Sequence, residues 1–356
     1  MKVSVILGTR PEIIKMAPVI RELGKCGVDF FILHTGQHYS ADMDSIFFDE
    51  LHLPKPKYNL GIGSGTHAEQ TGKMLIGIEE LLLQEKPDVV LAEGDTNSVL
   101  ASFLAAAKLH IKVGHVEAGL RSYDRNMPEE LNRTLADHLS DFLFAPTEKA
   151  KYILLNEGIP EGRIFVTGNT IVDAVYQNIE FAKRKSTILG KLSLRERGYF
   201  LVTIHRQENV DIGDRLWGIL EGLNLVRNEF RLPLIFPIHP RTRRRLDEFR
   251  LTVPTGLTLV NPIAFLDFLM LEANSNLVLT DSGGIQEETC ILKVPCVTMR
   301  DNTERPETLE VGSNILVGVN SQKILNGVSS MLSKEKDWQN PFGDGKAAVR
   351  IVETLI

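Results

Sequence analysis

Short apolar runs alternate with longer amphipathic segments along the chain, and this alternation is typical of βαβ units. In the first half, apolar runs without polar alternation predict the strands of a parallel sheet that helices cover on both faces. The predicted strands are residues 3–7, 29–34, 89–91, 113–116 and 142–144. The predicted helices are residues 11–23, 68–84, 98–108, 128–139 and 148–156.

The same alternation begins again in the second half. The charged stretch 180–198 has no long apolar run, which indicates the end of a linking helix and a domain boundary. The strands expected after it are residues 199–203, 234–238, 257–260, 277–280 and 296–299, with helices from Asp214, Arg241, Phe265, Gly284 and Gln322, and a last helix over 346–356. We therefore predict an α/β protein with two Rossmann-like doubly wound domains, residues 1–175 and 199–345, joined by a linking helix and linker over 176–198.

The composition of the chain narrows the classes of function that it could have. The chain has 356 residues and a formal net charge of −6, which argues against general binding to nucleic acid or to an anionic membrane surface. The three cysteines, Cys26, Cys290 and Cys296, are too few for a disulfide framework or a zinc cluster, and we expect no metal. The first apolar run breaks at Gly8, and no run approaches the ~18 residues of a membrane span, so we expect a cytoplasmic protein.

Ligands of doubly wound sheets bind beyond the carboxyl ends of the strands. The first predicted strand leads into GTRPE at 8–12 and a helix that carries Lys15. Gly8 allows a tight turn, and Pro11 suits the first turn of a helix. The helix N-terminus together with Arg10 and Lys15 would bind a phosphate group, although a capped helix with a solvated Arg and Lys fits the same residues.

The segment TDSGGIQEE at 280–288 repeats this arrangement in the second half. Gly283 and Gly284 permit a close approach of the backbone to a ligand, and Ser282 would cap the helix and present its N–H groups to phosphate. The spacing fits neither a Walker A loop nor the dinucleotide-binding glycine pattern. Glu288 would either complement the helix dipole or accept hydrogen bonds from the vicinal diol of a ribose.

Three carboxylates follow other predicted strands. Asp95 could cap the next helix, and Glu129 begins a helix on which Arg133 shares its face. Glu117 follows a buried strand, where a carboxylate needs a partner or a ligand. Three carboxylates that converge at strand ends favour proton-transfer chemistry.

Two histidines also stand at strand ends. His205 and His239 could hydrogen-bond or protonate a departing phosphate near neutral pH, although a lone histidine is more often structural. Arg305 is a third candidate for holding phosphate. These residues extend the predicted ligand site in the second half.

With these motifs in view, the chain closely resembles the non-hydrolysing UDP-N-acetylglucosamine 2-epimerases. The matching motifs occur in family order over almost the whole chain. They are residues 8–12 with 15–18, 37–38, 94–96, 114–121, 128–133, 167–170, 281–288, 304–307 and 341–345.

The resemblance implies a GT-B-like architecture, in which the substrate binds between the two domains and the last helix, 346–356, returns to the first. It implies inversion at C2 of UDP-N-acetylglucosamine to give UDP-N-acetylmannosamine, without a metal or an added redox cofactor. The reaction eliminates UDP to 2-acetamidoglucal and then adds UDP again. A homodimer is also implied, as is activation by UDP-N-acetylglucosamine at a second site near Gln37, His38 and Gln70.

The resemblance further assigns roles to the candidate residues. Asp95, Glu117 and Glu129 would carry the proton chemistry, with His205 at the diphosphate. The remaining substrate contacts are Arg10, Ser282, Gly283, Gly284 and Arg305 at the diphosphate, Glu288 at the ribose, Phe268 at the uracil, and Lys15, Arg133 and His239 elsewhere in the site.

Several alternatives stay open. The chain could act on a modified sugar such as UDP-2,3-diacetamido-glucuronate, or be a GT-B glycosyltransferase or a catalytically silent UDP-sugar sensor. A transferase has no use for three carboxylates around C2, and a sensor would tolerate their loss. The residues at 97–99 and the loop 122–127 depart from the pattern of bacterial relatives.

Overall fold

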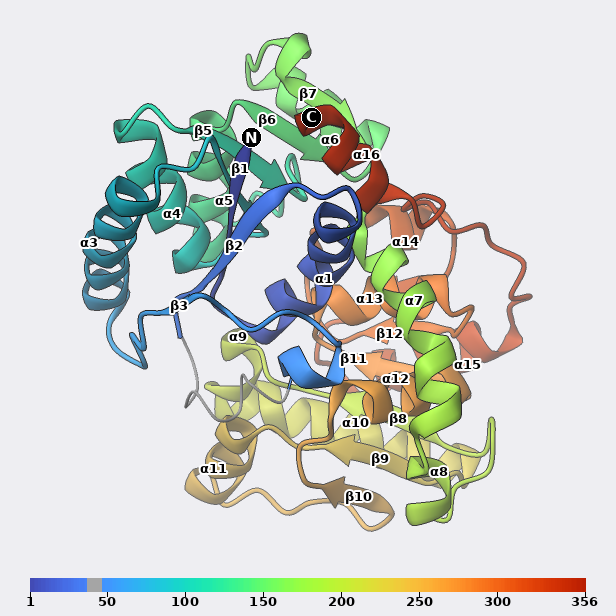
Figure 1. Cartoon of the computed structure of the whole chain (residues 1–356). Helices are drawn as coiled ribbons and strands as arrows, with labels where there is room; N and C mark the ends of the chain where they lie inside the picture. Colours follow the sequence, from blue (N-terminus) through green and yellow to red (C-terminus); the bar gives the residue numbers. More distant parts are fainter. Residues whose placement is uncertain (37–46) are drawn as a thin grey trace. The chain divides into compact units, whose positions relative to one another are not determined.

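The computed structural model describes residues 1–36 and 47–356. The chain forms two compact units, Met1–Gln177 with Phe342–Ile356, and Asn178–Pro341. Each unit is built around one parallel sheet with helices packed against it, which confirms the predicted α/β class with two Rossmann-like units (Figure 1). In the described part of the chain, none of the helices combines the length and apolar character that a membrane span requires.

The sheet of the first unit has seven parallel strands in the order β3-β2-β1-β4-β5-β6-β7. The chain moves from β1 outward to β3 and then returns to the other side of β1. The strands are β1 (Lys2–Leu7), β2 (Asp29–His34), β3 (Tyr58–Asn59), β4 (Val89–Glu93), β5 (Lys112–Val116), β6 (Phe142–Ala145) and β7 (Ile164–Val166).

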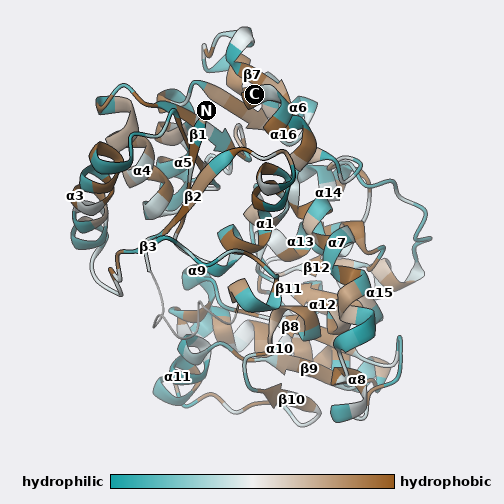
Figure 2. Cartoon of the chain, in the orientation of Figure 1, coloured by the Kyte–Doolittle hydropathy of each residue, from teal (hydrophilic) through white to brown (hydrophobic). Residues whose placement is uncertain are grey.

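Helices cover this sheet on both faces. The longer helices of this unit are α1 (Arg10–Lys25), α3 (His67–Glu85), α4 (Asn97–Lys108), α5 (Pro128–Leu139), α6 (Glu148–Asn156) and α16 (Ala347–Leu355). The helix α7 (Thr170–Lys185) begins in this unit and ends in the second. The neighbours α3, α4 and α5 pack side by side, and Ile78 and Phe103 join Val90 and Val113 of the strands in one apolar cluster. Figure 2 shows the strands mostly in the hydrophobic colours, as expected for a sheet buried on both faces.

The last segment of the chain belongs to the first unit. The carboxylate of Asp173 in α7 accepts the N–H groups of Ala347 and Ala348, at 3.2 and 3.0 Å, at the start of α16. Asn169 donates its N–H to the carbonyl of Phe342 at 2.8 Å, and α16 packs on α1. These contacts satisfy the exposed N–H groups of a helix N-terminus and fix α16 in place.

The second unit has a six-stranded parallel sheet in the order β10-β9-β8-β11-β12-β13. Its strands are β8 (Phe200–Thr203), β9 (Leu234–Pro237), β10 (Leu257–Val260), β11 (Leu277–Thr280), β12 (Cys296–Thr298) and β13 (Asn314–Leu316). Its helices are α8 (Ile188–Lys191), α9 (Gln207–Val210), α10 (Gly213–Phe230), α11 (Pro240–Glu248), α12 (Phe265–Asn274), α13 (Gly283–Ile291), α14 (Pro306–Glu310) and α15 (Ser321–Ser333). Cys290 and Cys296 are fully buried in this unit, as small apolar residues would be.

The strand order reverses at one place in each sheet. In the first unit the reversal lies between β1 and β4, and in the second between β8 and β11. A crevice beyond the carboxyl ends of the strands forms at such a point, and ligands bind there. Both candidate segments, 8–12 and 280–288, begin at the carboxyl end of a strand at the reversal.

Candidate functional site

Glu12 organises the turn that follows β1. Its carboxylate accepts the N–H groups of Gly8 and Thr9 and the hydroxyl of Thr96, each at 2.6 Å. Burial raises the pKa of Glu12 to about 7, and these three donors act against that rise. A side chain at Gly8 would collide with Ser98, so the turn lies directly against the start of α4. Glu12 thus joins the ends of β1 and β4.

Lys15 lies between two carboxylates. Its ammonium donates to Glu93 Oε1 at 2.9 Å and makes a second, closer contact with Glu117 Oε2. The three side chains are all buried, with side-chain exposures of 9%, 3% and 4% for Lys15, Glu93 and Glu117. Asn169 donates to Glu117 Oε2 at 3.2 Å. Of the sequence-predicted residues, the structure therefore brings Lys15 and Glu117 into direct contact.

Glu117 has a left-handed backbone with φ of 71°. For a residue other than glycine this conformation costs about 1–2 kcal/mol, and such strain is concentrated at functional sites. The turn is held by Asp137, which accepts from the N–H of Gly119 at 3.2 Å and pairs with His115 and Arg121, both at 2.7 Å. Burial raises the pKa of Asp137, but His115 and Arg121 outweigh it and keep the pKa below its usual range.

Asp95 is held by the helix α5. Arg133 forms an ion pair with the Asp95 carboxylate and a second one with Glu130, at 2.6 Å. Asn132 donates to the backbone carbonyl of Asp95 at 2.9 Å. Asp95 keeps 30% of its side chain exposed, so a ligand can still reach it.

Glu129 and Glu130 are neighbours with different surroundings. Glu130 is buried and accepts the N–H groups of Ser122 and Tyr123 at 2.9 and 2.8 Å, which fixes the loop before α5. Glu129 is half-buried and has no hydrogen-bond or ion-pair partner within residues 1–36 and 47–356. Of the two, Glu129 is the carboxylate that is free to meet a ligand.

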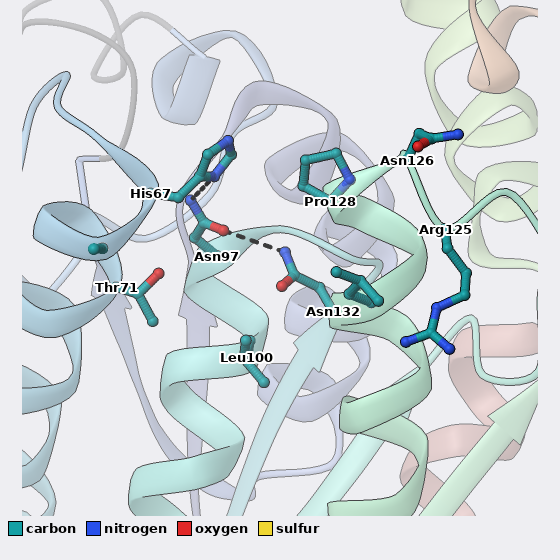
Figure 3. A pocket seen from close by; sticks show the side chains of 10 residues that line it. His67, Thr71, Asn97, Leu100, Arg125, Asn126, Pro128 and Asn132 are labelled. Atoms are coloured by element: carbon teal, nitrogen blue, oxygen red, sulfur yellow. Dashed lines mark hydrogen bonds between the residues drawn. The ribbon is translucent and has the colours of Figure 1, made fainter.

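A cavity of about 420 Å³ lies between α3, α4 and α5. Figure 3 shows Asn97 at its centre, hydrogen-bonded to His67 and Asn132, both at 3.2 Å. Arg125 reaches the cavity from the loop before α5. Because Asn132 also donates to the backbone carbonyl of Asp95, the cavity lies next to Asp95.

In the second unit Asp281 joins the ends of β8 and β11. Its fully buried carboxylate accepts the N–H groups of His205 and Arg206 at 3.0 Å and the amide of Asn209 at 3.2 Å. The imidazole Nε2 of His205 lies 3.9 Å from Asp281 Oδ1, and 43% of the His205 side chain is exposed. His205 is therefore fixed through its backbone, with its ring open to a ligand.

The start of α13 lies beside a group of buried charges. Ser282 is half-buried, and its side chain does not cap the helix. A side chain at Gly283 would collide with the carboxylate of Glu304, which Arg206 and Arg300 bind at 3.3 and 2.9 Å. The glycine is thus required by the close approach of Glu304.

Two further glutamates of α13 are buried. Arg305 is only 4% exposed, and its Nε lies 2.7 Å from Glu287 Oε1. Glu288 is 9% exposed, and the fully buried Glu272 of α12 faces it. Burial and the neighbouring Glu288 carboxylate raise the pKa of Glu272 well above its usual range.

The other predicted site residues have simpler surroundings. Arg10 is half-buried, and its guanidinium lies 4.7 Å from the centre of the Phe47 ring. Phe268 is partly buried in the apolar cluster around β8 and α12, and Gly284 has open space where a side chain would stand. His239 accepts the N–H of Arg241 at 3.2 Å, so it caps α11.

The proposed second site lies partly outside the described residues. Gln37 and His38 fall in the stretch 37–46, which the structure does not describe. Gln70 is buried in α3 and donates to the carbonyl of Gly63 at 2.8 Å. Among residues 1–36 and 47–356, no group of three or more His, Cys, Asp or Glu side chains is arranged to hold a metal ion.

The structure thus places the predicted residues in two groups. One, at the carboxyl edge of the first sheet, consists of Arg10, Lys15, Asp95, Glu117, Glu129 and Arg133. The other, in the second unit, consists of His205, His239, Phe268, Ser282, Gly283, Gly284, Glu288 and Arg305. Glu12, Glu93, Asp281 and Glu304 had no role in the prediction from the sequence. Glu93 could have been identified there, because it is a carboxylate at the end of a strand, directly before the motif at 94–96.

Comparisons with known proteins agree along the whole chain. The family model for UDP-N-acetylglucosamine 2-epimerase matches residues 21–356. A protein of that name from Methanocaldococcus jannaschii is 59% identical, over 100% of this chain and 99% of its own. The crystal structure of the M. jannaschii UDP-GlcNAc 2-epimerase with UDP-GlcNAc and UDP has a TM-score of 0.95 and 59% identity, covering 100% of this chain and 99% of that one. A UDP-2,3-diacetamido-2,3-dideoxy-D-glucuronate 2-epimerase from Pseudomonas aeruginosa is 42% identical, over 100% and 99% of the two chains. Together with the fold, these likenesses mean that the chain belongs to the UDP-N-acetylglucosamine 2-epimerase family.

Proposed function

We propose that this protein interconverts UDP-N-acetylglucosamine and UDP-N-acetylmannosamine by inversion at C2. The observation that carries the proposal is the pair of carboxylates Asp95 and Glu117, each bound to a buried cation at the carboxyl ends of neighbouring strands. The 59% identity to the M. jannaschii epimerase over full length supports the choice of substrate.

The reaction needs both a base and a stabilised leaving group. The C2 proton is not acidified by a carbonyl, so a carboxylate removes it while the bond between C1 and the diphosphate oxygen breaks. The products of this step are 2-acetamidoglucal, with a C1–C2 double bond, and UDP. Addition of UDP and return of a proton to the opposite face of C2 gives the epimer. Asp95, Glu117 and Glu129 are the groups we assign to this proton transfer.

The second unit supplies most of the nucleotide contacts in this proposal. The N–H groups at the start of α13, from Ser282 to Gly284, favour negative charge on the departing diphosphate. His205, with its exposed ring, donates a hydrogen bond there. The remaining assignments are Arg10 and Arg305 at the diphosphate, Glu288 at the ribose, Phe268 at the uracil, and Lys15, Arg133 and His239 elsewhere in the site.

A second candidate substrate is UDP-2,3-diacetamido-glucuronate, which the 42% identity to the P. aeruginosa enzyme supports. Incubation of the purified protein with each UDP-sugar, followed by proton NMR of the products, separates the two. We expect conversion of UDP-N-acetylglucosamine at a kcat/KM at least tenfold higher. The reverse preference would assign the modified sugar, and the absence of any product from both would leave a transferase or a sensor.

We further propose a cytoplasmic homodimer that UDP-N-acetylglucosamine activates. Large apolar side chains are exposed on α3 and α5, namely Ile76 and Leu83 at 62% and 55%, and Leu131 and Leu135 at 44% and 51%. Sedimentation should give twice the chain mass, and Leu135→Glu should lower it. Conversion of UDP-N-acetylmannosamine alone should be slow until a trace of UDP-N-acetylglucosamine is added.

A further inference from the structure

Glu93, the last residue of β4, has no part in the reaction as proposed above. Its side chain is 3% exposed, and its Oε1 accepts from Lys15 Nζ at 2.9 Å. The parallel register of β4 and β5 places Glu93 opposite Val116, directly before Glu117. The same ammonium also binds Glu117, so a single lysine lies between two carboxylates from neighbouring strands.

Several carboxyl groups gather around one ammonium in this cluster. Lys15 contacts the two buried carboxylates of Glu93 and Glu117, and the carboxyl group of Glu12 also faces Glu93 from α1. Ionising a buried carboxyl group is costly, and more so beside a second carboxylate, so such a group favours its protonated form. Burial raises the pKa of Glu93 well above its usual range; Lys15 opposes the rise, and Glu117 and Glu12 add to it. The raised pKa favours the protonated form of Glu93.

We propose that Glu93 is a positioning residue for Glu117, and that it acts through Lys15. In its protonated form, Glu93 accepts a hydrogen bond from Lys15 and leaves the positive charge of Lys15 to Glu117. Glu117 is then ionised and fixed at the position from which it exchanges the C2 proton. When Glu93 ionises at higher pH, it competes for Lys15, and turnover falls. This inference rests on the proposed function.

Two substitutions at Glu93 separate the effect of its ionisation from the effect of its hydrogen bond with Lys15. Glu93→Gln keeps an acceptor for Lys15 but cannot ionise, whereas Glu93→Leu removes the acceptor. We expect Glu93→Leu to lower kcat about tenfold or more with KM within about threefold, and Glu93→Gln to lower it much less. In Glu93→Gln, the pH at which kcat falls on the alkaline side should be higher than in the wild type by about one unit or more.

The matched control is Glu85→Gln. Glu85 is also largely buried and pairs with two lysines, Lys2 and Lys57, at 2.6 and 2.8 Å. Lys2 begins β1, so this cluster lies at the opposite end of the strands from Glu93. The pH profile of kcat in Glu85→Gln should match that of the wild type.

A second measurement does not depend on activity. Because the pKa of Glu93 is raised in the folded state, its contribution to stability is present at low pH and is lost as pH rises. Urea unfolding from pH 5 to 9 should therefore show the wild type losing stability relative to Glu93→Gln as pH rises. A pH-independent difference, or an active wild type with the same alkaline limb as Glu93→Gln, overturns the inference. If the wild type has no epimerase activity, the proposed function fails with the positioning role, while the unfolding curves still report whether Glu93 is protonated.

Discussion

The carboxylate of Asp281 accepts the backbone N–H of His205 at 3.0 Å, and so ties the end of β8 to the end of β11. The same carboxylate receives the N–H of Arg206 and the amide of Asn209. These bonds hold the loop that presents the His205 ring, although Asp281 itself is fully buried. Asp281 therefore has a positioning role that its place in the motif at 280–288 did not indicate.

Asp281→Asn should weaken both the fold and the binding of UDP. The amide has one acceptor oxygen, and its NH₂ group would face N–H donors, so we expect a loss of about 1–3 kcal/mol in the free energy of unfolding. The dissociation constant for UDP should rise about tenfold in calorimetry. Asp211→Asn is the control, since Asp211 is a partly exposed partner of Arg241 and Arg245 and should cost less than about 1 kcal/mol. Wild-type stability and UDP affinity in Asp281→Asn would remove Asp281 from the account.

A methyl group added at Gly283 should lower the free energy of unfolding much more than one added at Gly284. In Gly283→Ala the new Cβ would collide with Glu304, which two arginines hold in place, so we expect a loss of about 1–3 kcal/mol. The Cβ of Gly284→Ala would meet open space, so its stability should stay within about 1 kcal/mol of the wild type. Thermal unfolding without ligand measures both, and equal effects would contradict the close approach of Glu304.

Glu117→Gln should separate binding from turnover. The amide keeps the shape of the side chain but cannot take up a proton, so kcat should fall about 100-fold or more. UDP binding in calorimetry should stay within about twofold of the wild type, since our assignment gives Glu117 no contact with the nucleotide. Turnover near the wild-type rate would take Glu117 out of the mechanism.

Glu12 should make stability depend on pH. Its pKa is raised from 4.5 to about 7 in the folded state, so folding favours the protonated form. The wild type should thus lose about 3 kcal/mol relative to Glu12→Gln as pH rises from about 4 to 8, with most of the loss complete near pH 7. Urea unfolding of both proteins across this range measures the difference. A difference that stays constant, or that grows in favour of the wild type at higher pH, would mean that the hydrogen bonds to Glu12 outweigh its burial.

The hydrophobic pattern predicted the long elements well because their periodicity is local. The helix expected over 128–139 is α5, and the strands expected over 257–260 and 277–280 are β10 and β11. The short edge strands β3, β7 and β13 were not predicted, because two or three residues carry no periodic signal. The end of a helix expected within 180–198 is the end of α7 at Lys185, and the short helix α8 that follows in the same stretch was not predicted.

The site was predictable only in part. Strand ends with polar residues and helix starts with glycine stand out in one sequence, and Asp95, Glu117 and Ser282 were selected as candidates in this way. The partners of these residues are distant in sequence: Glu93 meets Lys15 across 78 positions, and Glu304 meets Arg206 across 98. Such pairs depend on the order of strands in the sheet, which local patterns do not contain.

The most direct test of the central claim is an incubation of the wild-type protein with UDP-N-acetylglucosamine in D₂O, followed by proton NMR. Removal and return of the C2 proton predicts that UDP-N-acetylmannosamine appears with deuterium at C2, and that deuterium also enters the recovered substrate. Formation of the epimer with its original C2 proton, or no product and no exchange, would contradict the account.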